Sequence, residues 1–190
     1  MSELSSILTI YTEATPNPET MKYVANKMIL SGESADFPTK ESAQLSPLAK
    51  KLFEFSFVEG VFVMNNFVTI TKNKTADWFD INPILKEYIK GFVESGEQAV
   101  LKPDTHDAFD ENDPEVVKKI KELLEMHVKP AVEMDGGAIS FKSYDQGKVT
   151  VTLKGACSGC PSSTITLKAG IEGLLKRMVP EVTEVVAESV

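Results

Sequence analysis

The strongest signal in this chain lies within residues 147–178, GKVTVTLKGACSGCPSSTITLKAGIEGLLKRM. Its first part, up to Leu153, is predicted to form a strand. Its last part carries apolar residues at helical spacing, namely Ile165, Leu167, Ile171, Leu174, Leu175 and Met178. Between them, the loop GACSGCP holds Cys157 and Cys160, the only cysteines of the chain. A strand, a cysteine loop and a helix are therefore predicted in direct succession.

Two tight turns predict β-hairpins. The first is Asn65-Asn66, because asparagine tolerates the left-handed conformation that a tight hairpin needs. The second is Asp145-Gln146-Gly147. The predicted strands span residues 7–12, 21–25, 61–64, 67–71, 138–144, 148–153 and 183–187.

A capping residue followed by proline occurs three times, at Ser46-Pro47, Asn82-Pro83 and Asp113-Pro114. The side chain of the first residue accepts a hydrogen bond from a free backbone amide, and proline is tolerated at the first helical position. Each pair therefore predicts the start of a helix. Gly96 is expected to end the second helix, and Pro130 limits how far the third continues. Trp78 and Phe79 precede the second start and are predicted to belong to the core.

The predicted helices and strands indicate an α+β chain of two small α/β-layered domains, and the composition of one segment indicates an acidic linker between them. The segment KPDTHDAFDENDP, residues 102–114, holds five acids, two prolines and little that could pack. We therefore expect an N-terminal domain at 1–100, a linker at 101–113 and a C-terminal domain at 114–190. Both domains are near the small end for independent folding.

The charge balance, the apolar runs and the first residues argue against nucleic-acid binding, a membrane span and a targeting peptide, respectively. Twenty basic residues against 28 acidic residues give a net charge of −8, whereas nucleic-acid binding usually needs a basic face. No apolar run approaches the ~20 residues that cross a bilayer. The first residues carry an acid at Glu3 and no Lys or Arg before Lys22, unlike a secretory or transit peptide. We therefore expect a cytoplasmic protein that binds neither nucleic acid nor membrane.

The position of the two cysteines indicates metal binding or redox chemistry rather than a purely structural role. They precede a predicted helix, with Ser162 or Ser163 as its cap, and the N-terminus of a helix favours thiolate over thiol. Gly155 and Gly159 let the backbone bend tightly there. Thiolate is the form that binds a metal or attacks a disulfide, and C-x-x-C spacing is typical of both uses.

Three uses of this pair compete. A thioredoxin-type dithiol is disfavoured, because only 30 residues follow Cys160 and that fold needs more. A zinc site within one chain needs four ligands, and the only other soft ligands are His106 in the linker and His127 on an apolar helix face. We expect His127 to be packed. A two-fold dimer, in contrast, supplies the four thiolates that an iron–sulfur cluster takes; a bridged zinc ion stays open.

Two longer segments resemble a known family. The segment VKPAVEMDGGAISFKSYDQGKVTVTLKGACSGCPSSTITLKAGIEGLLKRMVPEVTEVVA resembles the C-terminal NifU-like domain of Nfu proteins, which are iron–sulfur cluster scaffolds and carriers. This resemblance covers residues from about 114 to 188 and rests on MDGG (134–137), the cysteine loop, the T-L-K helix and the closing P-E-V. In the first half, TEATPNPETMKYVAN resembles the N-terminal domain of the same proteins.

The resemblance implies a carrier rather than an enzyme. Cys157 and Cys160 from each of two subunits would hold one bridging cluster, usually [4Fe–4S] with [2Fe–2S] also possible, in a homodimer. The partners would be the upstream cluster assembly machinery and the apo iron–sulfur proteins that accept the cluster. Ala138 departs from the family, which commonly has an acid there, but this residue is not a ligand.

Other segments are assigned on weaker grounds. Asp135-Gly136-Gly137 is predicted to be a turn between a helix and a strand. Thr15-Pro16-Asn17-Pro18 is either a stiff turn or an interaction loop. Residues 1–100 contain no Cys, His or Gly-rich phosphate loop, so we expect the N-terminal domain to recognise partner proteins.

Overall fold

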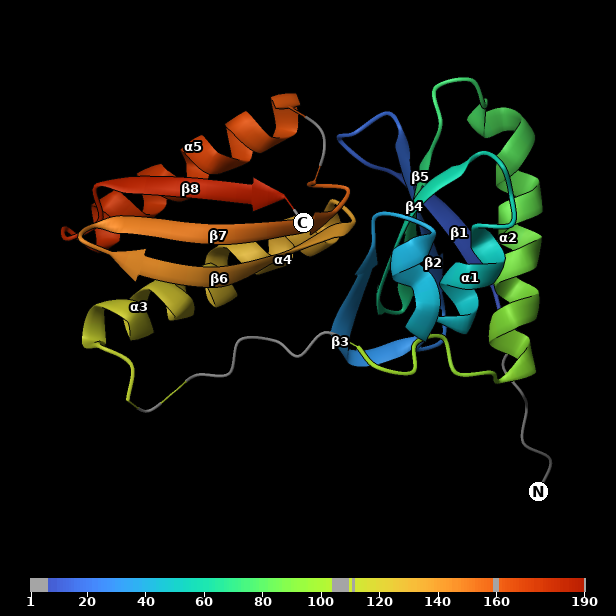
Figure 1. Ribbon diagram of the computed structural model, residues 1–190, viewed down its shortest axis with the longest axis horizontal. Coiled ribbons are helices and arrows are strands. Elements are labelled where there is room, and N and C mark those ends of the chain that lie inside the picture. Colours follow the sequence, from blue (N-terminus) through green and yellow to red (C-terminus); the bar gives the residue numbers. More distant parts are fainter. Residues whose placement is uncertain (1–6, 104–109, 111, 159–160, 190) are drawn as a thin grey trace. The chain divides into compact units, whose positions relative to one another are not determined.

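The computed structural model describes residues 7–103, 110, 112–158 and 161–189, with only the backbone of 161–163 (Figure 1). The chain forms two compact units, which are described separately. Each unit combines helices with its own sheet, which confirms the α+β prediction. Residues 104–109 and 111 of the predicted linker, including His106, lie outside the described residues.

The N-terminal unit is built on a five-stranded antiparallel sheet in the order β1-β2-β5-β4-β3. Leu48 and Leu52 of helix α1 and Leu85 and Ile89 of helix α2 lie in one core with residues of this sheet such as Val63. The elements are β1 (Ile10–Ala14), β2 (Thr20–Ala25), β3 (Leu30–Phe37), a 3-10 turn η1 (Glu41–Leu45), α1 (Pro47–Leu52), β4 (Val58–Asn65), β5 (Phe67–Lys72) and α2 (Trp78–Ser95).

The start of α2 differs from the prediction. The helix begins at Trp78, and the Asp77 carboxylate accepts a hydrogen bond from the Phe79 amide at 2.8 Å. Pro83 therefore lies inside the helix, and the Asn82 side chain instead accepts a hydrogen bond from the Tyr23 hydroxyl at 2.6 Å. Trp78 packs against the core, but Phe79 is 86% exposed, so its assignment to the core is wrong.

In this unit the predicted hairpin turn is correct, but one predicted strand start is not, and one strand was missed. Asn65 has a φ of 48°, and Met64 pairs with Phe67 across the predicted hairpin. Strand β1 begins at Ile10 rather than at Ile7. Strand β3 was not predicted, because LSGESADF has few apolar residues and lies beside β4 at the edge of the sheet that the described residues form.

The C-terminal unit has a three-stranded sheet in the order β6-β7-β8. Strands β6 (Gly137–Asp145) and β7 (Lys148–Gly155) form the predicted antiparallel hairpin, with positive φ at Gln146 and Gly147. Helix α5 (Pro161–Met178) connects β7 to the parallel strand β8 (Glu184–Ser189) (Figure 1). The cysteine loop thus lies between β7 and α5.

One broken helical segment precedes this sheet. It comprises α3 (Glu115–Leu123), a π-helical turn η2 (Leu124–Val128) and α4 (Lys129–Met134), with Pro130 in the first turn of α4. Asp113 does not cap α3 as predicted, because Pro114 occupies the cap position and the Asp113 carboxylate pairs with Lys121 at 2.7 Å. In the part of the chain that the structure describes, no helix is long and apolar enough to cross a membrane.

Candidate functional site

The loop that carries Cys157 is fixed to the end of β7 by its own backbone. Gly155 ends the strand with a φ of 65° and pairs with Gly137 on β6. The Ala156 amide then donates to the Gly136 carbonyl at 3.2 Å. The Ser158 amide and hydroxyl both donate to the Gly155 carbonyl, at 3.0 and 2.9 Å. The chain therefore turns immediately after the strand, as the glycine predicted.

Cys157 is held from the helix side and from the sheet side. The Thr164 hydroxyl, in the first turn of α5, donates to the Cys157 carbonyl at 3.3 Å. On the other side lies Gly137, where an added Cβ would be 2.9 Å from the Cys157 sulfur and 2.5 Å from the Lys154 carbonyl oxygen. No side chain fits in that space. The glycine therefore creates the room in which the sulfur lies.

The Asp135-Gly136-Gly137 segment is the predicted turn and also part of the site. The Asp135 and Gly136 amides donate to Ala131 and Glu133 carbonyls at the end of α4, and Gly136 has a φ of 85°. Gly137 then starts β6 beside the sulfur. In the sequence, the two adjacent glycines indicated a turn at this segment. They did not indicate the contact of Gly137 with Cys157, because that contact depends on the register of β6 and β7.

The thiol environment contradicts the expectation of a favoured thiolate. Burial, with a smaller contribution from the nearby Asp135 carboxylate, raises the pKa of Cys157 to about 12. The side chain is only 6% exposed. Helix α5 begins at Pro161, four residues later, and the Thr164 hydroxyl in its first turn donates to the Cys157 carbonyl. Loss of hydration therefore outweighs the helix terminus.

The other predicted site residues are only partly described. Cys160 and Gly159 lie outside the described residues, as do the side chains of the expected caps Ser162 and Ser163. His127 is exposed on the π-helical turn, so the expectation that it is packed is wrong. Among the residues with a described position, no group of three or more His, Cys, Asp or Glu side chains could hold a metal ion.

Two family descriptions match this chain. "Scaffold protein Nfu/NifU N terminal" matches residues 10–96, and "NifU-like domain" matches residues 120–186. The second match contains the cysteine loop and the glycine turn. The first covers nearly all of the N-terminal unit.

Proteins of similar sequence carry related names. The human "NFU1 iron-sulfur cluster scaffold homolog, mitochondrial" is 41% identical over 175 residues, covering 91% of this chain and 69% of the relative. The Arabidopsis thaliana "NifU-like protein 5, mitochondrial" is 42% identical over 187 residues, covering 94% and 67%. The Drosophila willistoni NFU1 homolog is 41% identical over 184 residues, covering 93% of this chain and 62% of the relative.

These names overturn the predicted compartment. The relatives are named as mitochondrial proteins, so the prediction of a cytoplasmic protein is wrong. That prediction rested on the lack of a membrane-spanning apolar run and on the first residues of the chain. The chain spans 62–69% of the length of these relatives, so the residue at which it begins does not decide the compartment.

Proposed function

Because the chain belongs to the Nfu family of iron–sulfur cluster scaffold proteins, we propose that Cys157 and Cys160 hold an iron–sulfur cluster as cargo for transfer to apo-proteins. An iron–sulfur cluster takes four Cys thiolates, and the chain has two cysteines. The proposal is therefore a cluster bridged between two subunits, of the [4Fe–4S] type. The upstream partner is a cluster assembly system.

The observation that carries this proposal is the way in which Cys157 is placed. Backbone hydrogen bonds fix its loop to β7, and the absent side chain of Gly137 leaves room beside the sulfur. The sulfur is thus positioned by the sheet before any cargo arrives. In the empty state the high pKa keeps the thiol protonated, and metal binding would release the proton. Such a site keeps the Cys157 thiol buried and protonated while no cluster is bound, and it still allows the thiol to bind a metal.

The same features argue against a dithiol oxidoreductase. A nucleophilic cysteine needs a lowered pKa and access to its substrate, whereas Cys157 is buried with a raised pKa. The family and the relatives are named for scaffold proteins rather than for a reaction. A zinc-bridged interaction module uses the same thiols and is separated from the carrier by metal and sulfide content.

The test replaces one thiol at a time. Cys157→Ser and Cys160→Ser are expected to abolish stable cluster binding after anaerobic reconstitution with iron and sulfide, because each removes two of four ligands from the dimer. Iron, sulfide and visible absorption are measured on the same samples. Ser158→Ala is the matched control, since it removes only the 2.9 Å bond to the Gly155 carbonyl. A Cys157→Ser protein with the cluster content of the control would contradict the ligand assignment.

For the N-terminal unit we propose a role in recognising the proteins that exchange the cluster. Its part of the sequence contains no Cys or His, so it supplies no thiolate or imidazole ligand. The family description that matches this unit, "Scaffold protein Nfu/NifU N terminal", supports a role of the unit in scaffold function. Its surface is therefore the place to search for a docking site.

A further inference from the structure

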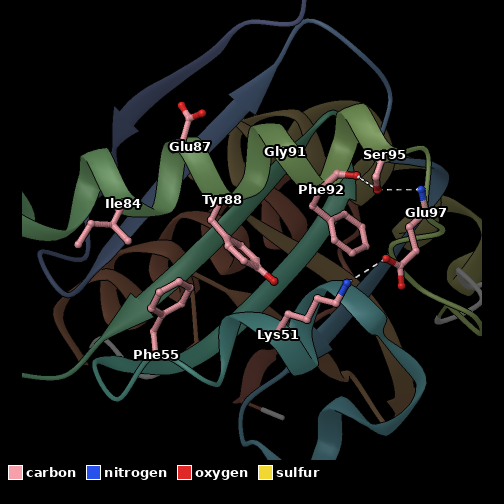
Figure 2. Close-up of a pocket in the computed structure, with 9 residues that line it drawn as sticks. All are labelled: Lys51, Phe55, Ile84, Glu87, Tyr88, Gly91, Phe92, Ser95 and Glu97. Atoms are coloured by element: carbon pink, nitrogen blue, oxygen red, sulfur yellow. Dashed lines mark hydrogen bonds and ion pairs between the residues drawn. The ribbon is translucent and has the colours of Figure 1, made fainter.

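The N-terminal unit contains a groove that the cluster proposal does not use. The groove has a volume of about 570 Å³ and lies between α2 and the end of α1 (Figure 2). Ile84, Tyr88 and Phe92 line it from α2, and Lys51 and Phe55 line it from the other side. Its volume falls within the ~300–1,000 Å³ of ordinary binding pockets.

Three aromatic rings line the groove, those of Phe55, Tyr88 and Phe92. The Tyr88 ring lies between the Phe55 and Phe92 rings in Figure 2 and meets Phe55 edge-to-face, with centroids 5.3 Å apart. Ile84 is 48% exposed beside them. The Tyr88 hydroxyl has no hydrogen-bond partner among the described residues, and in Figure 2 it is directed toward Lys51. The groove thus offers an apolar wall with a hydroxyl group that can hydrogen-bond to an occupant.

Gly91 is the feature that the unit's own packing does not explain. It lies in the interior of α2 and lines the groove. A glycine at such a position weakens a helix relative to alanine. A Cβ added there would meet no atom within 4 Å, so no neighbour in the structure requires its absence. The bare backbone leaves space above the helix that an occupant can fill.

The charges at the groove are mainly negative. Lys51 pairs with Glu97 at 3.0 Å, and its ammonium lies 5.3 Å from the Phe92 ring centroid. Glu87 lines the groove without an ion-pair partner among the described residues. Glu54 also lies close enough to Lys51 to interact with it electrostatically. Glu97 and Glu54 therefore already offset the Lys51 ammonium, whereas the Glu87 carboxylate points away from Lys51 in Figure 2 and is open to a basic group from outside.

We propose that this groove docks a partner protein through a bulky apolar side chain that is flanked by Lys or Arg. The apolar side chain fills the space over Gly91 and contacts Tyr88 and Phe92. The basic side chain lies against Glu87, and the Tyr88 hydroxyl donates to a backbone carbonyl of the partner. The inference rests on the proposed function only in identifying the partner as a protein that exchanges the cluster.

The test uses a library of random peptides displayed on phage, selected against the full chain. We expect the selected peptides to pair an aromatic or large aliphatic residue with neighbouring Lys or Arg. Synthetic copies are then titrated against Gly91→Leu, which fills the groove, and Glu87→Lys, which reverses its charge. Each variant is expected to weaken binding by at least about tenfold.

Two matched variants control for general effects. Gly173→Leu makes the same change on α5, where an added Cβ also meets nothing within 4 Å. Glu94→Lys makes the same charge reversal on α2, outside the groove lining. Both are expected to bind the peptides like the wild type. Circular dichroism of Gly91→Leu confirms that its helix content is intact.

Several outcomes would overturn the proposal. They are the failure of any peptide to be enriched, selected peptides without the apolar and basic pair, and equal binding by Gly91→Leu and Gly173→Leu. Self-association that Gly91→Leu abolishes, measured by sedimentation, would make a second copy the occupant. Cluster content is measured in parallel, because a protein that binds the peptides but no cluster would refute the proposed function and leave the groove proposal standing.

Discussion

At the scale of single residues, Gly137 is the residue on which the site depends most. A Cβ there would approach the Lys154 carbonyl oxygen to 2.5 Å, and a backbone atom cannot move aside as a flexible side chain can. We expect Gly137→Ala to lower the free energy of unfolding by about 1–3 kcal/mol. The displaced sulfur should also lower the amount of cluster retained. Urea unfolding and iron content measure the two effects.

Gly170→Ala is the control for this prediction. Gly170 lies within α5, where an added Cβ meets nothing within 4 Å. Alanine is the better helix former, so this variant should be as stable as the wild type or slightly more stable. Equal stability of Gly137→Ala and Gly170→Ala would show that the close approach at Gly137 is not a constraint.

The buried thiol makes stability depend on pH. The pKa of Cys157 is raised from 9.0 to about 12 in the folded chain, so the folded state binds more protons between these values. Its contribution is complete below about pH 9 and is lost as the pH rises toward 12. Burial also raises the pKa of Tyr23, which adds to the loss in the same direction.

We therefore expect the free energy of unfolding of the cluster-free protein to fall between pH 8.5 and 10.5 by less in Cys157→Ala than in the wild type. The difference between the two proteins isolates Cys157 from Tyr23 and from the lysines. Urea unfolding at several pH values, with reductant present, measures it. The same pH dependence in both proteins would show that the thiol is not buried as described.

At the scale of elements, α2 shows how a local signal can be overridden. Asn82-Pro83 has the composition of a helix start, but Asp77 caps the helix and Trp78 packs against the core five positions before Pro83. Asp77→Ala should lower the free energy of unfolding by about 1 kcal/mol, because an amide loses its partner. Asp77→Asn retains a capping oxygen and should restore most of the stability. Thermal unfolding compares the two variants, and equal loss would contradict the assignment of the cap.

Features that depend on neighbouring residues in the sequence were predicted correctly, whereas features that depend on distant parts of the chain were not. The turns at Asn65 and Gly147 depend on the left-handed conformation of the turn residues, so the sequence was sufficient for both hairpins. Strand β3 depends on pairing with β4, and LSGESADF carries no pattern of its own.

The same distinction between local and non-local features applies to the candidate site. The cysteine spacing, the strand before it and the helix after it are local features and were predicted. Cys157 is buried beside Gly137, which strand register places there, and burial raises the thiol pKa where the helix terminus was expected to lower it. The groove over Gly91 was also missed, because α1 and α2 meet there from distant parts of the chain.

At the scale of the whole molecule, the proposed cluster site is incomplete in each single chain. Two cysteines provide half of the thiolates that a cluster takes. Cluster binding and dimer formation should therefore be one event. Removal of the cluster with a chelator should separate the subunits that it bridged.

Native mass spectrometry of the anaerobically reconstituted full chain tests this claim most directly, because it counts chains, iron and sulfide in one species. We predict a species of two chains with one [4Fe–4S] cluster, and loss of both the cluster and this species in Cys157→Ser. A cluster bound to a single chain, or a zinc-bridged dimer without sulfide, would contradict the account.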